Sequence, residues 1–174
     1  MRDTPVIVFI NKMDRDGKNQ QQLVKVGLDG CDLTPSWSRD GKKLLFSARR
    51  EASEGKESVL NCQAFSSTKP PFTTSCPSHI WEVDIETHQV RQLTSGDFHD
   101  GRVAIRPDGS MIAFTSNRDN SWNVWLMDRE GGDLRRLTEH EGYSGYSAWS
   151  PDGKKIIYVS DRSGNLDLWM LCLQ

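Results

Sequence analysis

The residue types that carry out catalysis in proteins occur in this chain, but their spacing does not match a catalytic arrangement. The nearest match to the Gly-x-Ser-x-Gly turn that exposes a nucleophilic serine is Gly142-Tyr-Ser144-Gly-Tyr146, which ends on tyrosine instead of glycine. Nothing in the sequence places a general base beside Ser144. We therefore expect Ser144 to be a loop serine, the chain to have no catalytic residues, and the protein not to be an enzyme.

Patterns that bind metals and cofactors are also incomplete. Asp14-Arg-Asp16-Gly17 resembles part of a calcium loop but lacks the glutamate that closes such a loop. The cysteines show neither Cys-x-x-Cys nor mixed Cys/His spacing, and the remaining histidines are scattered (Cys31, Cys62, Cys76, Cys172; His79, His88, His140). We expect no metal and no cofactor.

An internal repeat supplies the elements that position the other residues. In its cleanest copy, Trp149–Leu171, a Ser-Pro-Asp-Gly turn precedes a strand at Ile156–Ser160, and a polar turn precedes a second strand at Leu166–Leu171. Related copies cover Ile105–Asp128 and Trp37–Arg50. Each unit therefore predicts turn, strand, turn and strand.

The period of the repeat predicts the fold. Trp81, Trp125 and Trp169 lie 44 residues apart, and so do Asp108 and Asp152. A period near 44 with four short strands per unit is typical of a β-propeller blade. The sequence predicts an all-β fold, a partial β-propeller of about three to four antiparallel four-stranded blades, of which two are complete and two incomplete.

We predict one domain over residues 1–174. It divides into an incomplete or atypical first blade, a blade with a long insertion, a complete blade, and a last blade that lacks its final strand (residues 1–32, 33–94, 95–138 and 139–174). The insertion covers residues 51–78 and separates the second and third strands of its blade. Its Ser, Thr and Pro content favours a long surface loop, and Cys62 and Cys76 flank its tip. In an exported protein these two cysteines would be placed to form a disulfide, and otherwise they would be free thiols.

Antiparallel strand order predicts which loops share a face. Loops between the second and third strands of a blade, and loops that join one blade to the next, emerge on one face, and the Asp-Gly turns on the other. We call the first of these the loop face. Aromatic and charged residues there are our candidate partner contacts (Phe98, His99, Asp100, Tyr143 and Tyr146). The alternative is that they are solvated loop residues.

Large aromatic residues recur at the same positions of successive units. Recurrence in register favours packing between blades over a ligand cage. We expect this role for eight residues (Trp37, Phe46, Trp81, Phe114, Trp125, Trp149, Tyr158 and Trp169).

Composition argues against two classes of partner. The chain has 22 basic and 24 acidic residues, a net charge of −2, so no basic face for nucleic acid is indicated. Mean hydropathy is −0.62, and no apolar run approaches the roughly 18 residues of a membrane span. The apolar stretch Pro5–Ile10 is shorter than the ~7–15 residues usual in a signal peptide. We expect no nucleic-acid binding and no membrane insertion.

The motif Asn11-Lys-Met-Asp14 could serve nucleotide chemistry. With its flanks, VFINKMDRDGK, it resembles translation-factor GTPases of the release-factor type, in which the asparagine and aspartate read the guanine base. The phosphate-binding pattern GxxxxGK[ST] is missing from the chain. A simpler interpretation is two strands, at Val6–Lys12 and Leu23–Gly27, joined by a polar turn. A GTPase-derived N-terminal segment fused to a propeller is kept as a third alternative.

The repeat itself resembles a known family. WSPDGKKIIYVSDRSGNLDLWM, with DREGGDLRRLT in the preceding unit, resembles the TolB-like (WD-type) propeller repeat, and similar repeats form the propellers of prolyl-oligopeptidase-like serine peptidases. The resemblance is strong over Phe98–Leu171, good over Leu33–Arg50 and His79–Thr94, and weak before Leu33.

The resemblance implies a non-enzymatic scaffold that binds partner proteins, in the periplasm. The sequence itself names no compartment. The alternative is the substrate-gating propeller of a prolyl-oligopeptidase-like peptidase whose catalytic domain is absent. Because two blades are incomplete, we expect a fragment of a longer propeller, or self-association through open sheet edges.

Overall fold

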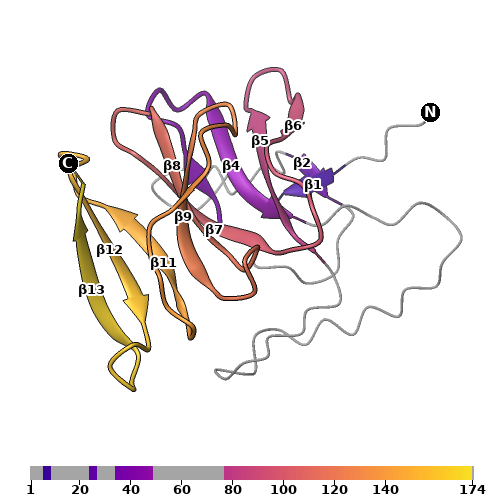
Figure 1. Ribbon diagram of the computed structural model, residues 1–174. Coiled ribbons are helices and arrows are strands. Elements are labelled where there is room, and N and C mark those ends of the chain that lie inside the picture. The colour runs from indigo at the N-terminus through magenta and orange to yellow at the C-terminus, as the bar shows by residue number, and fades with distance from the viewer. Residues whose placement is uncertain (1–5, 9–23, 27–33, 49–76, 174) are drawn as a thin grey trace, which may run out of the picture.

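The described part of the chain is built of antiparallel β-strands. The computed structural model describes residues 6–8, 24–26, 34–48 and 77–173, and these residues form no helix. Three sheets stand side by side (Figure 1), which we name the first blade (β3–β6), the middle blade (β7–β10) and the last blade (β11–β13). Their strands are β3 (Ser36–Trp37), β4 (Lys43–Ala48), β5 (His79–Asp84), β6 (Val90–Gln92), β7 (Asp100–Ile105), β8 (Met111–Ser116), β9 (Asn123–Asp128), β10 (Arg135–Arg136), β11 (Ser144–Trp149), β12 (Lys155–Ser160) and β13 (Asp167–Cys172).

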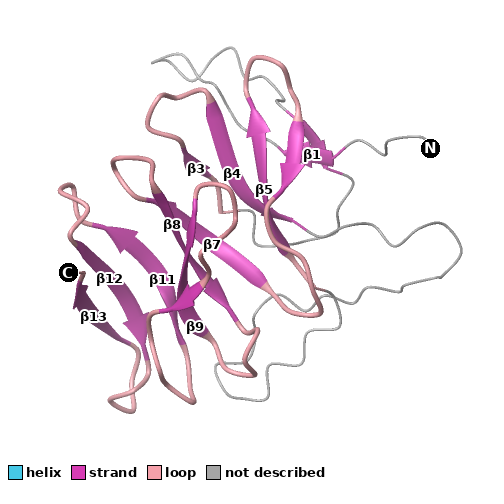
Figure 2. Ribbon diagram, turned by 45° about the horizontal axis from the view of Figure 1, so that its top comes forward, coloured by secondary structure: helices cyan, strands magenta, loops and turns pink. Residues whose placement is uncertain are grey.

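These sheets confirm the prediction of an all-β, partial propeller. The first and middle blades have four strands each, joined in sequence order, and the last blade has three within the described residues. Figure 2 shows the three blades fanned about one side, with β13 at an outer edge and the ring not closed. Within the part of the chain described, no helix is long and apolar enough to cross a membrane.

Tight turns join the first and second strands of each blade. In each turn a glycine has a positive φ, and the carboxylate of the preceding aspartate accepts a backbone N–H bond from the residue two positions after that aspartate. The positions recur in all three blades (Asp40 and Gly41, Asp108 and Gly109, Asp152 and Gly153). The left-handed conformation explains why glycine recurs there, since it strains any residue with a Cβ atom.

Aromatic pairs occupy equivalent places in the three sheets. Phe46 lies opposite Trp81, Phe114 opposite Trp125, and Tyr158 opposite Trp169, on the second and third strands. The first member of each pair is at most 1% exposed, and these residues confirm the packing that their recurrence predicts. Trp37 differs, because 51% of its surface is exposed.

Apolar side chains fill the spaces between neighbouring blades. Leu45 and Ile80 of the first blade form one cluster with Ile112 of the middle blade. Ala113 and Leu126 of the middle blade form another cluster with Ile156 of the last blade. Each blade thus presents one apolar face to the blade before it and one to the blade after it.

Several expectations fall on residues outside the described ranges. They concern Asn11–Asp14, most of the insertion at 51–78, and the Cys62–Cys76 pair. The division into four blades by residue number also stays a prediction. The strands expected near the N-terminus are present as β1 (Val6–Val8) and β2 (Val24–Val26), which pair antiparallel.

One local expectation was wrong. Ser144 is not a loop residue, because it is the first residue of β11 and is fully buried. Its hydroxyl lies 3.0 Å from the hydroxyl of Ser160 on β12. The strand begins two residues earlier than the alternation of Tyr146–Ser150 indicates, because a β-bulge between Gly145 and Ala148 interrupts that alternation.

Candidate interaction surface

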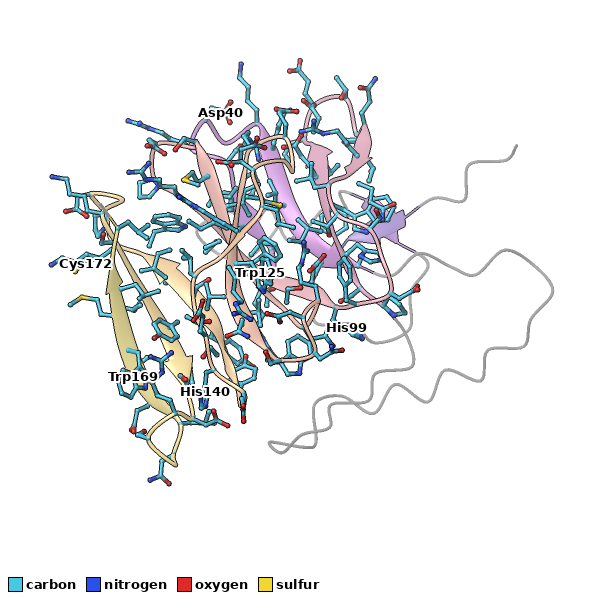
Figure 3. The ribbon with its side chains drawn as sticks, viewed as in Figure 1. Asp40, His99, Trp125, His140, Trp169 and Cys172 are labelled. Atoms are coloured by element: carbon cyan, nitrogen blue, oxygen red, sulfur yellow. The ribbon has the colours of Figure 1, made fainter. Side chains whose placement is uncertain are left out.

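The loop face exists as the strand order predicts. The loop after β8 and the loop after β10 are joined by an ion pair between Asp119 and Arg136, and Trp122 forms a β-bridge with Tyr143. Figure 3 shows His99 and His140 at one end of the molecule and Asp40, in an Asp-Gly turn, at the other.

Asp100 lies within the sheet of the middle blade and is fully buried. Arg118 donates a hydrogen bond of 2.8 Å to its Oδ1 atom, and His79 Nδ1 lies 3.9 Å from Oδ2, beyond hydrogen-bond distance. Burial raises the pKa of Asp100, but the proximity of His79, the charge of Arg118 and the hydroxyl of Ser116 outweigh it, so the pKa lies below its usual value. Asp100 is therefore a buried anion that organises the base of the loop face.

Phe98 and His99 form the wall above Asp100. The guanidinium of Arg118 lies over the Phe98 ring, 4.6 Å from its centroid, and the ring of His79 meets Phe98 edge-on at 6.1 Å. His99 is buried, with its Nδ1 atom 2.9 Å from the Ser78 hydroxyl. These contacts fix the loop that leads into β7.

Tyr143 and Tyr146 stand at the start of the last blade. The bulge in β11 gives Tyr146 a φ of 52°, and the matching bulge in β7 gives the same φ to Arg102, 44 residues earlier. Arg102 donates a hydrogen bond of 2.8 Å to the Tyr143 hydroxyl, and its guanidinium lies 3.7 Å from the centroid of Tyr146. A Cβ atom at Gly145 would lie 2.4 Å from the Tyr143 hydroxyl, so glycine is needed for this close approach.

One continuous network joins the two groups. The ring of Trp122 lies 6.0 Å from His99 and 6.4 Å from Tyr143, and Tyr143 lies 6.2 Å from Tyr146. Among the candidate contacts, Tyr146 is the most open, with 53% of its surface exposed, and His99 and Asp100 are buried. The network can present one aromatic ring, backed by a cation, to a partner.

Sequence reasoning missed three residues of this network: Arg102, Arg118 and Trp122. The repeat held a signal for two of them. Arg118 and Arg162 are 44 residues apart, and Arg162 lies over the Trp169 ring at 4.9 Å just as Arg118 lies over Trp125 at 5.0 Å. Arg102 shares its register with Tyr146.

An acidic hollow adjoins the network on the same face. It has a volume of about 530 Å³ and is lined by seven residues (Asp119, Asn120, Ser121, Arg136, Glu139, His140 and Glu141). Arg136 pairs with both Asp119 and Glu139. Across the described ranges, no group of three or more histidine, cysteine, aspartate and glutamate side chains is arranged to hold a metal ion.

Strand order, blade packing and loop arrangement together define a β-propeller. Residues 72–171, more than half of the chain, match the family described as the Tricorn protease N-terminal beta propeller domain. The chain belongs to this family. No curated protein matches it in sequence.

Solved structures give the same class. TolB from Acinetobacter baumannii is 25% identical with a TM-score of 0.65, and the match covers 92% of this chain and 34% of that one. A putative TolB from Agrobacterium tumefaciens is 24% identical with a TM-score of 0.51, over 80% of this chain and 57% of that one. A Mycobacterium tuberculosis puromycin-hydrolyzing peptidase is 14% identical with a TM-score of 0.58, over 90% of this chain and 22% of that one. This chain therefore spans about a third of the Acinetobacter TolB, and the fold is shared with both TolB and peptidase propellers.

Proposed function

We propose that this chain is a non-enzymatic propeller module that binds a partner protein through the loop face. One observation carries the proposal: Tyr146 is half-exposed at a positive φ and stacks on the guanidinium of Arg102. A strained, solvent-facing aromatic residue with a fixed cation behind it loses little freedom on binding, and such residues are typical interface anchors. The likeness to TolB supports a scaffold.

The candidate contacts divide by role under this proposal. Tyr146 and Tyr143 touch the partner, because they lie at the open end of the network. Phe98, His99 and Asp100 position the loops, because His99 and Asp100 are buried and Phe98 packs beneath Arg118.

Site-specific photo-crosslinking tests the surface. A photoreactive phenylalanine analogue at position 146 should capture a partner, and the same analogue at Lys42, on the opposite face, serves as the control. The affinity of the identified partner should then fall by at least about thirtyfold in Tyr146→Ala, as for an interface anchor, and stay unchanged in Lys42→Ala. A partner that crosslinks equally at both positions, or that binds Tyr146→Ala at full affinity, would refute the choice of face.

A second candidate is the substrate-gating propeller of a prolyl-oligopeptidase-like peptidase. The observations that favour it are the family match and the shared fold of the puromycin-hydrolyzing peptidase. It predicts a hydrolase domain encoded next to this chain, and reading the neighbouring coding sequence tests that directly.

We also propose that open sheet edges allow self-association. Within the described residues β13 pairs only with β12, so one side of its backbone is available to another chain.

A further inference from the structure

An apolar face of the last blade is open to solvent. Its members lie on β12, on β13 and just before β13, and their exposed fractions are 46% for Ile157, 54% for Leu166, 74% for Leu168 and 57% for Met170. We call these four residues the outer face. They are four of the seven exposed large hydrophobic residues in the described part of the chain. Such clustering marks an interaction surface.

The middle blade shows what this face is built to do. The residues 44 positions earlier are Ala113, Trp122, Val124 and Leu126, and each is at most 3% exposed. Ala113 and Leu126 are covered by Ile156 and Trp149 of the next blade. The outer face therefore repeats a surface that is dry wherever a neighbouring sheet is present.

The chemistry of the missing cover follows from the blade contacts. Glu82 of the first blade pairs with Arg129 of the middle blade, 47 residues later. The next such pair is apolar, since Leu173 packs against the cluster that contains Leu126, again 47 residues earlier. Met170 occupies the place of Glu82 and Leu126, so its cover is also apolar. No charge stands on the outer face to oppose such a cover.

We propose that a second copy of this chain covers the outer face, so that two last blades pack face to face about a two-fold axis. In the described part of the chain no other cluster of exposed large hydrophobic residues is available as a counterpart, because the remaining three, Trp37, Leu134 and Tyr146, are scattered. A two-fold axis lets one self-complementary surface bury itself and leaves no open-ended chain of subunits. This inference deepens the proposed self-association and is independent of the loop face.

The strand geometry gives the interface a built-in reporter. Side chains alternate along β13, so Leu168, Met170 and Cys172 point to the same side. Cys172 is a free, exposed thiol. Cysteines placed near the axis would therefore meet their own copies in the second chain.

Sedimentation equilibrium of the full chain between about 1 and 100 µM tests the pairing. Wild type should form a dimer, and Leu168→Glu and Met170→Glu should weaken dimerisation at least about a hundredfold, because each would bury a carboxylate in an apolar contact. Leu134→Glu is the matched control, since Leu134 is 43% exposed outside the outer face. Circular dichroism should show all variants folded. A wild-type monomer over the whole range, or an equal loss in the control, would overturn the proposal.

Disulfide trapping tests the symmetry. In a Cys172→Ser background, adding Met170→Cys should give a reducible covalent dimer under mild oxidation, and the background alone should not. A dimer that depends on Leu168 yet forms no crosslink through position 170 would rule out the two-fold arrangement in favour of a head-to-tail one. Partner binding through Tyr146 is measured separately, so failure of either proposal leaves the other intact.

Discussion

The middle and last blades carry the same repeat in the same register and differ in what covers them. Val124 is fully buried and Leu168, 44 residues later, is 74% exposed; Leu126 is fully buried and Met170 is 57% exposed. The residue types are alike, so the difference comes from the neighbouring sheet and not from the strand pattern. In a repeat protein the stability of each blade depends on the interface with the next one.

A matched pair of truncations should show the largest contrast. Leu126→Ala should lower the free energy of unfolding by about 2–5 kcal/mol, because it leaves a cavity between two blades. Met170→Ala should change it by less than about 0.5 kcal/mol, because that side chain meets solvent. Urea denaturation at concentrations where both variants are monomeric measures the two values. Equal losses would mean that Met170 is covered within the monomer.

The paired arginines should respond differently because their partners differ. Arg118 hydrogen-bonds the buried Asp100, whereas Ser144, an uncharged serine, occupies the place of Asp100 in the blade of Arg162. Arg118→Ala should cost about 3 kcal/mol, since it leaves a buried carboxylate without its closest cation. Arg162→Ala should cost about 1 kcal/mol, mainly lost packing on the Trp169 ring. Chemical denaturation of the two variants checks the order.

The same contrast predicts a pH dependence. The pKa of Asp100 is lowered in the folded protein by His79 and Arg118 against the opposing effect of burial. An unfolded aspartate titrates near pH ~4, so the stabilisation is complete above that pH and is lost as the pH falls through the folded-state pKa. Asp100→Asn should therefore flatten the fall of unfolding free energy below about pH 4. Ser144→Ala, the matched change in the last blade, should leave the slope as in wild type.

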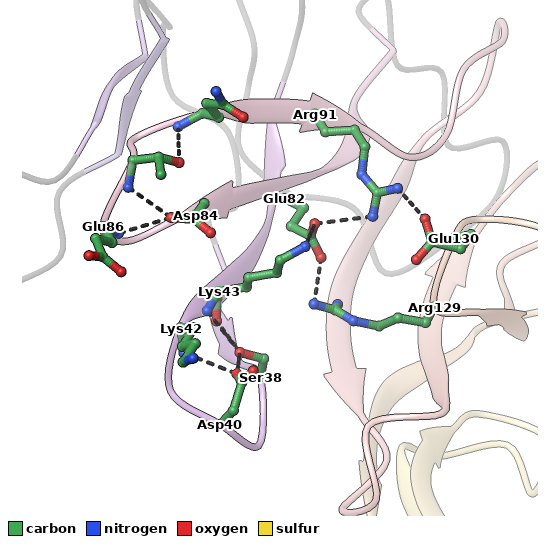
Figure 4. Close-up of polar contacts among 12 residues, drawn as sticks. Ser38, Asp40, Lys42, Lys43, Glu82, Asp84, Glu86, Arg91, Arg129 and Glu130 are labelled. Atoms are coloured by element: carbon green, nitrogen blue, oxygen red, sulfur yellow. Dashed lines mark hydrogen bonds and ion pairs between the residues drawn. The ribbon is translucent and has the colours of Figure 1, made fainter.

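A buried carboxylate distinguishes the first blade interface from the second. Figure 4 shows Glu82 among Lys43, Arg91 and Arg129, with distances of 2.9, 3.1 and 2.5 Å. Glu82 is 3% exposed, whereas Leu126 occupies this position in the middle blade. The first interface is thus held by charge and the second by apolar contact.

Converting one interface into the other tests this difference. Glu82→Leu alone should cost about 2 kcal/mol, because three cations lose their shared carboxylate and all three are partly solvated. Adding Arg129→Leu, which copies the Leu126–Leu173 arrangement, should recover about half of that cost. A double-mutant cycle by thermal unfolding measures the coupling. Additive losses would show that Arg129 contributes nothing through Glu82.

Much of the fold could be predicted from the sequence, because a propeller states its period repeatedly. The aromatic pairs at Phe114–Trp125 and Tyr158–Trp169 and the Asp-Gly turns are local patterns, and the strands follow them. The bulges could not be predicted, because they shift register without changing composition. As a result Ser144 was placed in a loop although it starts β11.

The candidate surface was predictable only in part. Strand order identified the loop face, but loop composition could not distinguish the buried Asp100 from the exposed Tyr146. That distinction depends on Arg118, which reaches Asp100 from 18 residues away in the chain. Similarly, the alternation of Leu168 and Met170 predicts an apolar face but not whether a sheet covers it.

The smallest contrast concerns the tryptophans at the two ends of the described blades. Trp149 Nε1 donates a hydrogen bond of 3.0 Å to the carbonyl of Ala104 in the preceding blade, whereas Trp37, at the same place in the first blade, is half-exposed. Trp149→Phe should cost about 1 kcal/mol for the lost bond, and Trp37→Phe less than about 0.5 kcal/mol. Thermal unfolding of the two variants checks this. Since both replacements remove the same atoms, a larger loss at Trp37 would show that the first blade is covered by a further sheet on that side.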